Sequence, residues 1–149
     1  MGEYIDEFSI QTGIEVQLLN QAGDEFELSS IAEVQLVCIL QEALTNVRKH
    51  SQADHVIVQI AREDGNAIAA TDYIPGAASF IHMKVEDDGK GFDLNTSRRS
   101  FGLQTMRERA QSVGGDLEVT SCSGMGTQVE LRLPCVEQEA VKKRSLVLS

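Results

Sequence analysis

The segment 31–50 constrains the fold more than any other part of the chain, because it is expected to form one long helix with a single apolar side. Its apolar residues recur at intervals of three and four and make one stripe, formed by Val37, Leu40, Leu44 and Val47. Either Ser29 or Ser30 is suited to cap the start of this helix. A helix with one apolar stripe has to pack on another apolar surface, so the rest of the chain must provide one.

Five short segments are expected to form the strands that provide this surface. They alternate apolar and polar residues or are rich in β-branched ones, and they cover 14–18, 55–60, 79–86, 116–121 and 128–133. Two further helices are expected at 3–11 and 102–113, the second of them stopped by Gly114-Gly115. This mixture, which closes with a hairpin, indicates an α+β fold and not a doubly wound nucleotide-binding fold.

Length and composition are those of a single soluble domain. The chain has 149 residues, of which 42% are apolar and 24% charged. We expect one domain over 1–134, with 63–78 as an inserted loop and 135–149 as a tail. No apolar run reaches the roughly 18 residues of a membrane helix, and the start lacks the features of a signal peptide. A cytoplasmic domain is expected; if the parent protein is anchored in the inner or plasma membrane, its anchor lies outside this segment.

Charge and cysteine content exclude several classes of function. The net charge of −10 argues against nucleic-acid binding, because backbone phosphates would be repelled. It does not exclude ATP, whose charge can be met locally by Mg²⁺ and a few cations. Cys38, Cys122 and Cys135 are odd in number and scattered, which fits neither a zinc site nor a disulfide framework. We interpret them as inert thiols in a reducing compartment.

One polar face of the helix expected at 31–50 carries side chains suited to a metal-bound phosphate. Their spacing of four, three and one positions groups them opposite the apolar stripe: Glu42, Asn46, Lys49 and His50. The amide oxygen of Asn46 suits Mg²⁺, and Lys49 can act as a point charge on phosphate oxygens. The alternative is an ordinary solvated helix face.

A glycine-rich turn follows the strand expected at 79–86. Gly89 and Gly91 allow close approach of a flat ligand or a turn with positive φ. Asp87, just before them, can accept the exocyclic amino proton of adenine, which is recognition of a base. The alternative is an acidic turn at the end of a strand.

Two other segments complete the candidate site. Gly102 opens a helix whose backbone N–H groups are suited to phosphate, with Arg98 and Arg99 preceding it. The segment 124–127 joins two strands and is explained equally well as a hairpin turn. The chain has neither a P-loop nor the Rossmann glycine pattern, so any nucleotide is bound by another fold.

In this order, these segments resemble the N, G1 and G2 boxes of the ATPase domain of histidine kinases, in the GHKL superfamily shared with type II topoisomerases, Hsp90 and MutL. Segment 41–50 resembles the N box, and 87–93, with its Asp-x-Gly-x-Gly pattern, resembles the G1 box. The remaining motifs of the ATP site in that family are resembled by three further segments, 101–109, 114–115 and 124–127. The motifs are most similar to those of kinases that act on response regulators of the NarL type. The resemblance covers about 14–134, nearly the whole domain.

The resemblance implies a two-layer α/β sandwich, the Bergerat ATP-binding fold, in which helices cover one face of a mixed sheet. It implies that Asp87 binds the adenine amino group with the assistance of Thr127. It also implies that Asn46 ligates Mg²⁺ and that Lys49 and His50 lie near the phosphates of ATP.

Further roles follow from the same resemblance. Gly89 and Gly91 would give the base room, while Gly102 and Leu103 would begin the helix that closes over the phosphates. Glu42 occupies the position often assigned to the general base. One departure from the pattern is Ser100, which stands where the first glycine of Gly-x-Gly-Leu is expected. The other is the length of 64–78, which no motif explains.

The implied function is transfer of the γ-phosphoryl group of ATP to a histidine on a separate dimerisation domain of a homodimeric parent kinase, with a NarL-type response regulator downstream. His50, His55 and His82 do not stand in the long acidic-flanked helix that an acceptor needs, so the chain is expected to bind ATP without phosphorylating itself. Two alternatives stay open: a nucleotide-binding regulatory module without kinase activity, and an anti-sigma-type serine kinase of the same fold. A nucleic-acid-translocating ATPase is disfavoured, because the chain is short and acidic.

Overall fold

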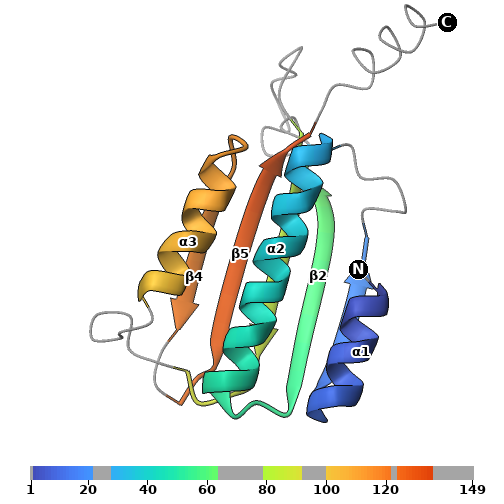
Figure 1. Ribbon diagram of the computed structural model, residues 1–149, viewed down its shortest axis with the longest axis vertical. Coiled ribbons are helices and arrows are strands. Elements are labelled where there is room, and N and C mark those ends of the chain that lie inside the picture. Colours follow the sequence, from blue (N-terminus) through green and yellow to red (C-terminus); the bar gives the residue numbers. More distant parts are fainter. Residues whose placement is uncertain (1, 22–27, 64–78, 92–99, 122–123, 136–149) are drawn as a thin grey trace, which may run out of the picture.

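Helices and a single sheet form two layers in the computed structural model, which describes residues 2–21, 28–63, 79–91, 100–121 and 124–135. The elements, in chain order, are α1 (Gly2–Thr12), β1 (Glu15–Asn20), α2 (Ser30–Asn46), the π-helical turn η1 (Val47–Ser51), β2 (His55–Glu63), β3 (Phe80–Asp87), α3 (Ser100–Gln111), β4 (Asp116–Ser121) and β5 (Thr127–Pro134). The three α-helices lie on one face of the sheet (Figure 1). This confirms the predicted α+β sandwich.

The sheet is mixed and its strand order is β1-β2-β3-β5-β4. β1 runs parallel to β2, with α2 in the connection between them, and the other neighbouring pairs are antiparallel. As a result, β3 ends beside the start of β5, with Glu86 opposite Gln128. The same end of the sheet also receives the C-terminus of α2 (Figure 1).

The core lies between α2 and the central strands. Ile39, Leu40 and Leu44 of α2 are completely buried. The strands bury every second residue against them, because successive strand side chains point to opposite faces; Val56, Val58, Ile60, Met83 and Leu131 are among these. The apolar stripe of the helix is therefore covered by the sheet, as its spacing predicted.

The predicted helix at 31–50 changes its hydrogen bonding before its expected end. Ser29 is the residue that caps it, because its Oγ accepts a hydrogen bond from the Ala32 N–H at 3.2 Å. The α-helix then stops at Asn46, and η1 continues the chain until Gln52, which adopts a left-handed φ of 55°. The helix predicted at 31–50 is present, but its last part is π-helical, which was not predicted because apolar spacing over a single turn does not distinguish α- from π-type hydrogen bonding.

The remaining boundaries lie within a few residues of their predicted positions. Gly114 ends the turn after α3 with a φ of 76°, and a β-carbon on Gly115 would overlap the Arg132 carbonyl oxygen of β5. Glu63 belongs to β2, so of the predicted inserted loop only 64–78 is left, and this lies outside the described residues. Of the predicted tail, the structure describes Cys135, whose N–H donates to the Ser79 carbonyl at 2.8 Å.

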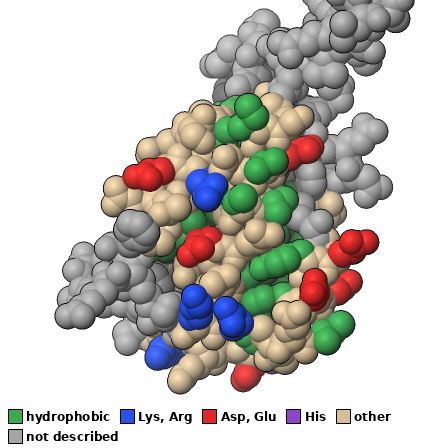
Figure 2. Space-filling model, viewed as in Figure 1, with side chains coloured by type: hydrophobic (Ala, Val, Ile, Leu, Met, Phe, Trp, Pro, Cys, Tyr) green, Lys and Arg blue, Asp and Glu red, His purple; other side chains and the backbone are tan. Residues whose placement is uncertain are grey.

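Surface properties are mixed over the described residues. Both apolar and charged side chains are visible on the helix-covered face (Figure 2). Ile31 and Val34 of α2 are among the exposed apolar residues. Cys38 and Cys135 have intermediate exposure, and Cys122 lies outside the described residues. None of the helices described here has the length and apolar character needed to cross a bilayer.

Candidate functional site

A pocket opens where four parts of the chain meet: the C-terminus of α2, the end of β3, the start of β5 and the first turn of α3. Its volume, including the open mouth, is about 410 Å³. It is lined by Ala43, Asn46, Val47, Val85, Asp87, Gly91, Leu103, Thr127 and Val129. The pocket therefore brings together residues from four of the segments that were expected to form one site, 41–50, 87–93, 101–109 and 124–127, whereas Gly114 and Gly115 pack against the end of β5.

Asp87 is the last residue of β3 and is only 7% exposed. Its carboxylate accepts a hydrogen bond from the Gly89 N–H at 2.9 Å and another from the backbone N–H of Thr127. Burial raises the pKa of Asp87 above its ordinary value, and the two N–H donors oppose that rise. The result is a fixed acceptor in an apolar pocket, which can receive an amino proton from a flat heterocycle.

The turn before β5 is built against Asp87. Gly126 has a φ of 77°, and a β-carbon on it would overlap the carbonyl oxygen of Asp87, so only glycine fits there. Thr127 follows, and its Oγ1 lies 2.8 Å from Oγ of Ser121. Ser121 in turn donates to the Gly126 carbonyl at 3.1 Å. Segment 124–127 is thus a hairpin turn and a wall of the pocket at once.

Ser121 is a site residue that sequence reasoning missed. It is buried at the end of β4, opposite Thr127 in the strand register. The signal for it was the alternation of β4, because Ser121 lies two residues after the inward-facing Val119 and shares its face.

Apolar side chains make most of the remaining lining. Val85 and Val129 come from β3 and β5, Ala43 and Val47 from the α2 side, and Leu103 from α3. Of these, only Leu103 was predicted as a site residue. Apolar walls with a few fixed polar groups are typical of pockets for small organic ligands.

On the helix side, the structure separates the predicted polar residues. Asn46 lines the pocket, whereas Lys49 is exposed in η1 and is not part of the lining. Glu42 lies one turn before Asn46, and its Oε1 is 3.2 Å from the position that a β-carbon on Gly102 would take. The first turn of α3 therefore packs closely against α2 at Glu42. The side chain of His50 lies outside the described part of the structure.

The glycines after β3 have different places. Gly91 is buried in the lining with a φ of 64°. Gly89 is not in the lining and contributes its N–H to Asp87. Arg98 and Arg99 lie outside the described residues.

The side chains at this pocket that could hold Mg²⁺ include the amide of Asn46. Among the residues that the structure describes, no group of three or more His, Cys, Asp or Glu side chains could hold a metal ion. Mg²⁺ bound with a nucleotide needs no such cluster, since it takes one or two protein ligands and completes its shell with phosphates and water. Asn46, with its amide at the edge of the pocket, fits that arrangement.

Comparison with known proteins identifies the class to which this fold and pocket belong. Residues 31–137 match the family model of histidine kinase-, DNA gyrase B- and HSP90-like ATPases. The chain belongs to this family.

The individual relatives narrow the class. The chain is 35% identical over 138 residues to the sensor histidine kinase LiaS of Bacillus subtilis, a match that covers 92% of this chain and 34% of that protein. It is 27% identical over 143 residues to the sensor protein VraS of Staphylococcus aureus, covering 94% of this chain and 37% of that protein. The chain thus corresponds to the ATP-binding catalytic part of sensor histidine kinases and spans a minor share of their length.

Solved structures share the fold. The histidine kinase domain of the blue-light activated kinase EL346 from Erythrobacter litoralis superposes with a TM-score of 0.64 at 22% identity, over 93% of this chain and 61% of that chain. At this identity the likeness concerns the architecture alone.

Proposed function

We propose that this chain transfers the γ-phosphoryl group of ATP to a histidine on a separate dimerisation domain of a sensor kinase. The observation that carries the proposal is that one pocket is lined both by the buried Asp87, from the segment that resembles the G1 box, and by the half-buried Asn46, from the segment that resembles the N box. The match to sensor kinases over nearly the whole chain supports the same conclusion.

In this proposal the sheet side of the pocket recognises adenine. Asp87 accepts the exocyclic amino proton, and Thr127, held by Ser121, extends the same hydrogen-bonding cluster. Val85 and Val129 pack on the faces and edge of the base. Gly91, which has no side chain, leaves room for the base in the pocket wall. Gly89 contributes the N–H that orients the Asp87 carboxylate.

The helix side receives the phosphates. Asn46 is the protein ligand for Mg²⁺, which supplies charge neutralisation of the phosphates when bound. Lys49 acts as a cation beside the phosphate oxygens and His50 lies near them, and Gly102 and Leu103 bring the start of α3 toward them. Glu42 orients the attacking imidazole or acts as its base. These groups contribute positioning and electrostatic stabilisation, which dominate phosphoryl transfer in general.

The partners follow from the same proposal. The two histidines whose side chains are described, His55 and His82, stand in strands β2 and β3, so the acceptor is placed on a separate dimerisation domain of a homodimeric parent. We further propose a response regulator of the NarL type downstream, a cytoplasmic position for this domain, and a parent protein anchored in the inner or plasma membrane.

Calorimetric titration with ATP, with and without Mg²⁺, tests the base assignment. Asp87→Asn is expected to weaken ATP binding by about 10- to 100-fold, because a charged hydrogen bond to the base is lost. Asp116→Asn, at the exposed start of β4, is the matched control and should bind as wild type does. Undiminished affinity in Asp87→Asn would sink the assignment.

Transfer is tested by mixing this chain with the dimerisation domain of its parent and labelled ATP. An acid-labile phosphate on that domain is expected. Acid-stable phosphate on a serine would indicate the anti-sigma type of kinase. ATP binding without transfer to either acceptor would indicate a regulatory module.

A further inference from the structure

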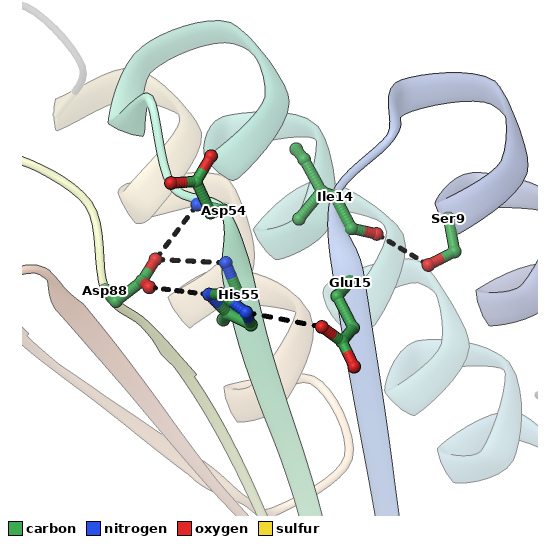
Figure 3. A network of polar contacts seen from close by, with 6 residues as sticks. All are labelled: Ser9, Ile14, Glu15, Asp54, His55 and Asp88. Atoms are coloured by element: carbon green, nitrogen blue, oxygen red, sulfur yellow. Dashed lines mark hydrogen bonds and ion pairs between the residues drawn. The ribbon is translucent and has the colours of Figure 1, made fainter.

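A polar cluster lies just outside the ATP pocket and begins at Asp88, the neighbour of Asp87. Oδ1 of Asp88 accepts hydrogen bonds from the backbone N–H groups of Asp54 and His55, both at 3.0 Å. Oδ2 lies 3.0 Å from Nδ1 of His55, and Nε2 of the same ring lies 3.2 Å from Oε2 of Glu15. Figure 3 shows that these side chains come from three neighbouring strand ends and point toward one another.

The cluster continues the sheet where its ladder stops. The last paired position of β2 and β3 is Val56 opposite Asp87. Beyond it, the N–H of Asp88 donates to the His55 carbonyl at 3.3 Å, and the Asp88 carboxylate takes the next two backbone N–H groups. We call this arrangement of Asp88, His55 and Glu15 the strand-end clasp.

The clasp determines the direction of Asp87. Consecutive residues of a strand point to opposite sides, and Asp88 is exposed while Asp87 is buried in the pocket. Holding Asp88 on the outside therefore holds Asp87 on the inside. It also sets the path of the chain to Gly89, whose N–H orients the Asp87 carboxylate.

We propose that the strand-end clasp positions Asp87 for base recognition, so that Asp88 and His55 are positioning residues of the ATP site. The inference rests on the proposed role of Asp87 in binding adenine. Neither Asp88 nor His55 lines the pocket, so their effect on nucleotide is indirect.

Charge on His55 tightens the clasp. The titratable groups facing the ring are Asp88 after β3, Glu15 on β1 and Asp54 before β2, and they raise the pKa of His55, the hydrogen bond to Asp88 contributing most. Bonds donated by the His55 and Asp54 backbone and the His55 ring lower the pKa of Asp88. A protonated ring donates to both carboxylates, whereas a neutral ring donates from one nitrogen only.

The sign of the pH dependence follows. Because the pKa of His55 is raised, its contribution is complete below the ordinary histidine value and is lost as pH rises through the raised value. Because the pKa of Asp88 is lowered, its contribution is lost only as pH falls through that lowered value. The clasp is therefore tightest between the lowered pKa of Asp88 and the raised pKa of His55. Adenine binding should weaken as the pH rises through the raised pKa of His55.

The test is calorimetric titration of the whole chain with ATP and with GTP, which lacks the 6-amino group. Asp88→Ala should weaken ATP binding about tenfold and change GTP binding little, so the ratio of ATP affinity to GTP affinity should fall. Asp54→Ala is the matched control: it removes one neighbouring carboxylate and keeps the backbone N–H that Asp88 accepts. It should leave both affinities within about twofold of wild type.

A second variant, His55→Gln, tests the proposal even if Asp88→Ala does not fold. The ratio of ATP affinities between wild type and His55→Gln, measured from about pH 6 to 9, should fall as pH rises, because only wild type loses a ring proton. Comparison with the variant cancels the titration of ATP itself.

Three outcomes separate the possibilities. A pH-independent ratio, or Asp88→Ala with unchanged adenine preference, overturns the positioning role while leaving the ATP site intact. Equal loss of ATP and GTP binding in Asp88→Ala overturns it in favour of a general structural role. Absence of ATP binding by wild type overturns the proposed function itself.

Discussion

The two ends of the pocket that we propose binds ATP, the proposed base end at Asp87 and the proposed phosphate end at Asn46, are built in different ways. At the base end, Asp87 and Thr127 are held by strand register, a buried serine and a glycine that admits no side chain. At the phosphate end, Asn46 stands at the last turn of a helix and Lys49 is exposed beyond it. The base end is held by backbone hydrogen bonds and close packing, whereas the phosphate end includes the exposed, charged side chain of Lys49. Substitutions should therefore act through shape at one end and through charge at the other.

The largest effect is expected at Gly126. Gly126→Ala places a β-carbon against the Asp87 carbonyl and strains a positive φ, which should lower the free energy of unfolding by about 3 kcal/mol. ATP binding should be lost with it. Chemical denaturation and ATP titration measure both.

Gly124→Ala is the control for that change. Gly124 also has a positive φ, of 83°, but a β-carbon there would meet nothing within 4 Å. Only the backbone strain remains, so the expected loss is about 1 kcal/mol. Equal losses of stability in Gly126→Ala and Gly124→Ala would contradict the conclusion that close contact with Asp87 limits position 126 to glycine.

The metal-dependent part of the affinity should respond to Asn46. Asn46→Ala is expected to lower ATP affinity about tenfold in Mg²⁺ and to leave the metal-free affinity unchanged, because one ligand of the ion is lost. Thr45→Ala changes the neighbouring residue, whose hydroxyl donates to the Gln41 carbonyl within the helix. A loss that is the same with and without Mg²⁺ would contradict a metal ligand at Asn46.

A smaller effect is expected at Ser121. Ser121→Ala removes the hydroxyl partner of Thr127, which should cost about 1 kcal/mol of stability and reduce ATP affinity a few-fold. Thr120→Ala alters the adjacent, exposed residue on the other face of β4 and should do neither. Thermal unfolding and calorimetry distinguish them, and identical behaviour would remove Ser121 from the base end.

The smallest effect is expected at Lys49. Because this lysine is exposed, Lys49→Ala should weaken ATP binding about two- to threefold, and the difference should shrink in high salt. Arg48→Ala is the control, since that side chain lines a groove with Tyr4 and Phe8 on the α1 side. A large loss of ATP affinity that is insensitive to salt would show that the phosphate end is more enclosed than the exposure of Lys49 indicates.

Sequence patterns were sufficient to predict most helices and strands, whereas their two-layer arrangement was predicted from the family resemblance. Alternation located β1, in which exposed and half-buried residues alternate over its first four positions, and β-branched residues located β2, in which buried residues recur at every second position. Helical spacing located α2. Its change to π-type hydrogen bonding after Asn46 was not predictable, since the apolar contacts of Val47 continue through the change.

The site was predictable where a residue type is tied to a local shape. Gly91 adopts the positive φ expected of a glycine turn, and Asp87 lies before it at the end of a strand. Ser121 and the strand-end clasp escaped prediction because their contacts depend on strand register. His55 and Asp88 are 33 positions apart and meet only because β2 pairs with β3.

The antiparallel register of β3 and β5 has an evolutionary consequence. With Glu86 opposite Gln128, Asp87 stands across from Thr127 whatever the number of residues that join them. Insertions and deletions between the two strands that preserve this register therefore keep Asp87 beside Thr127.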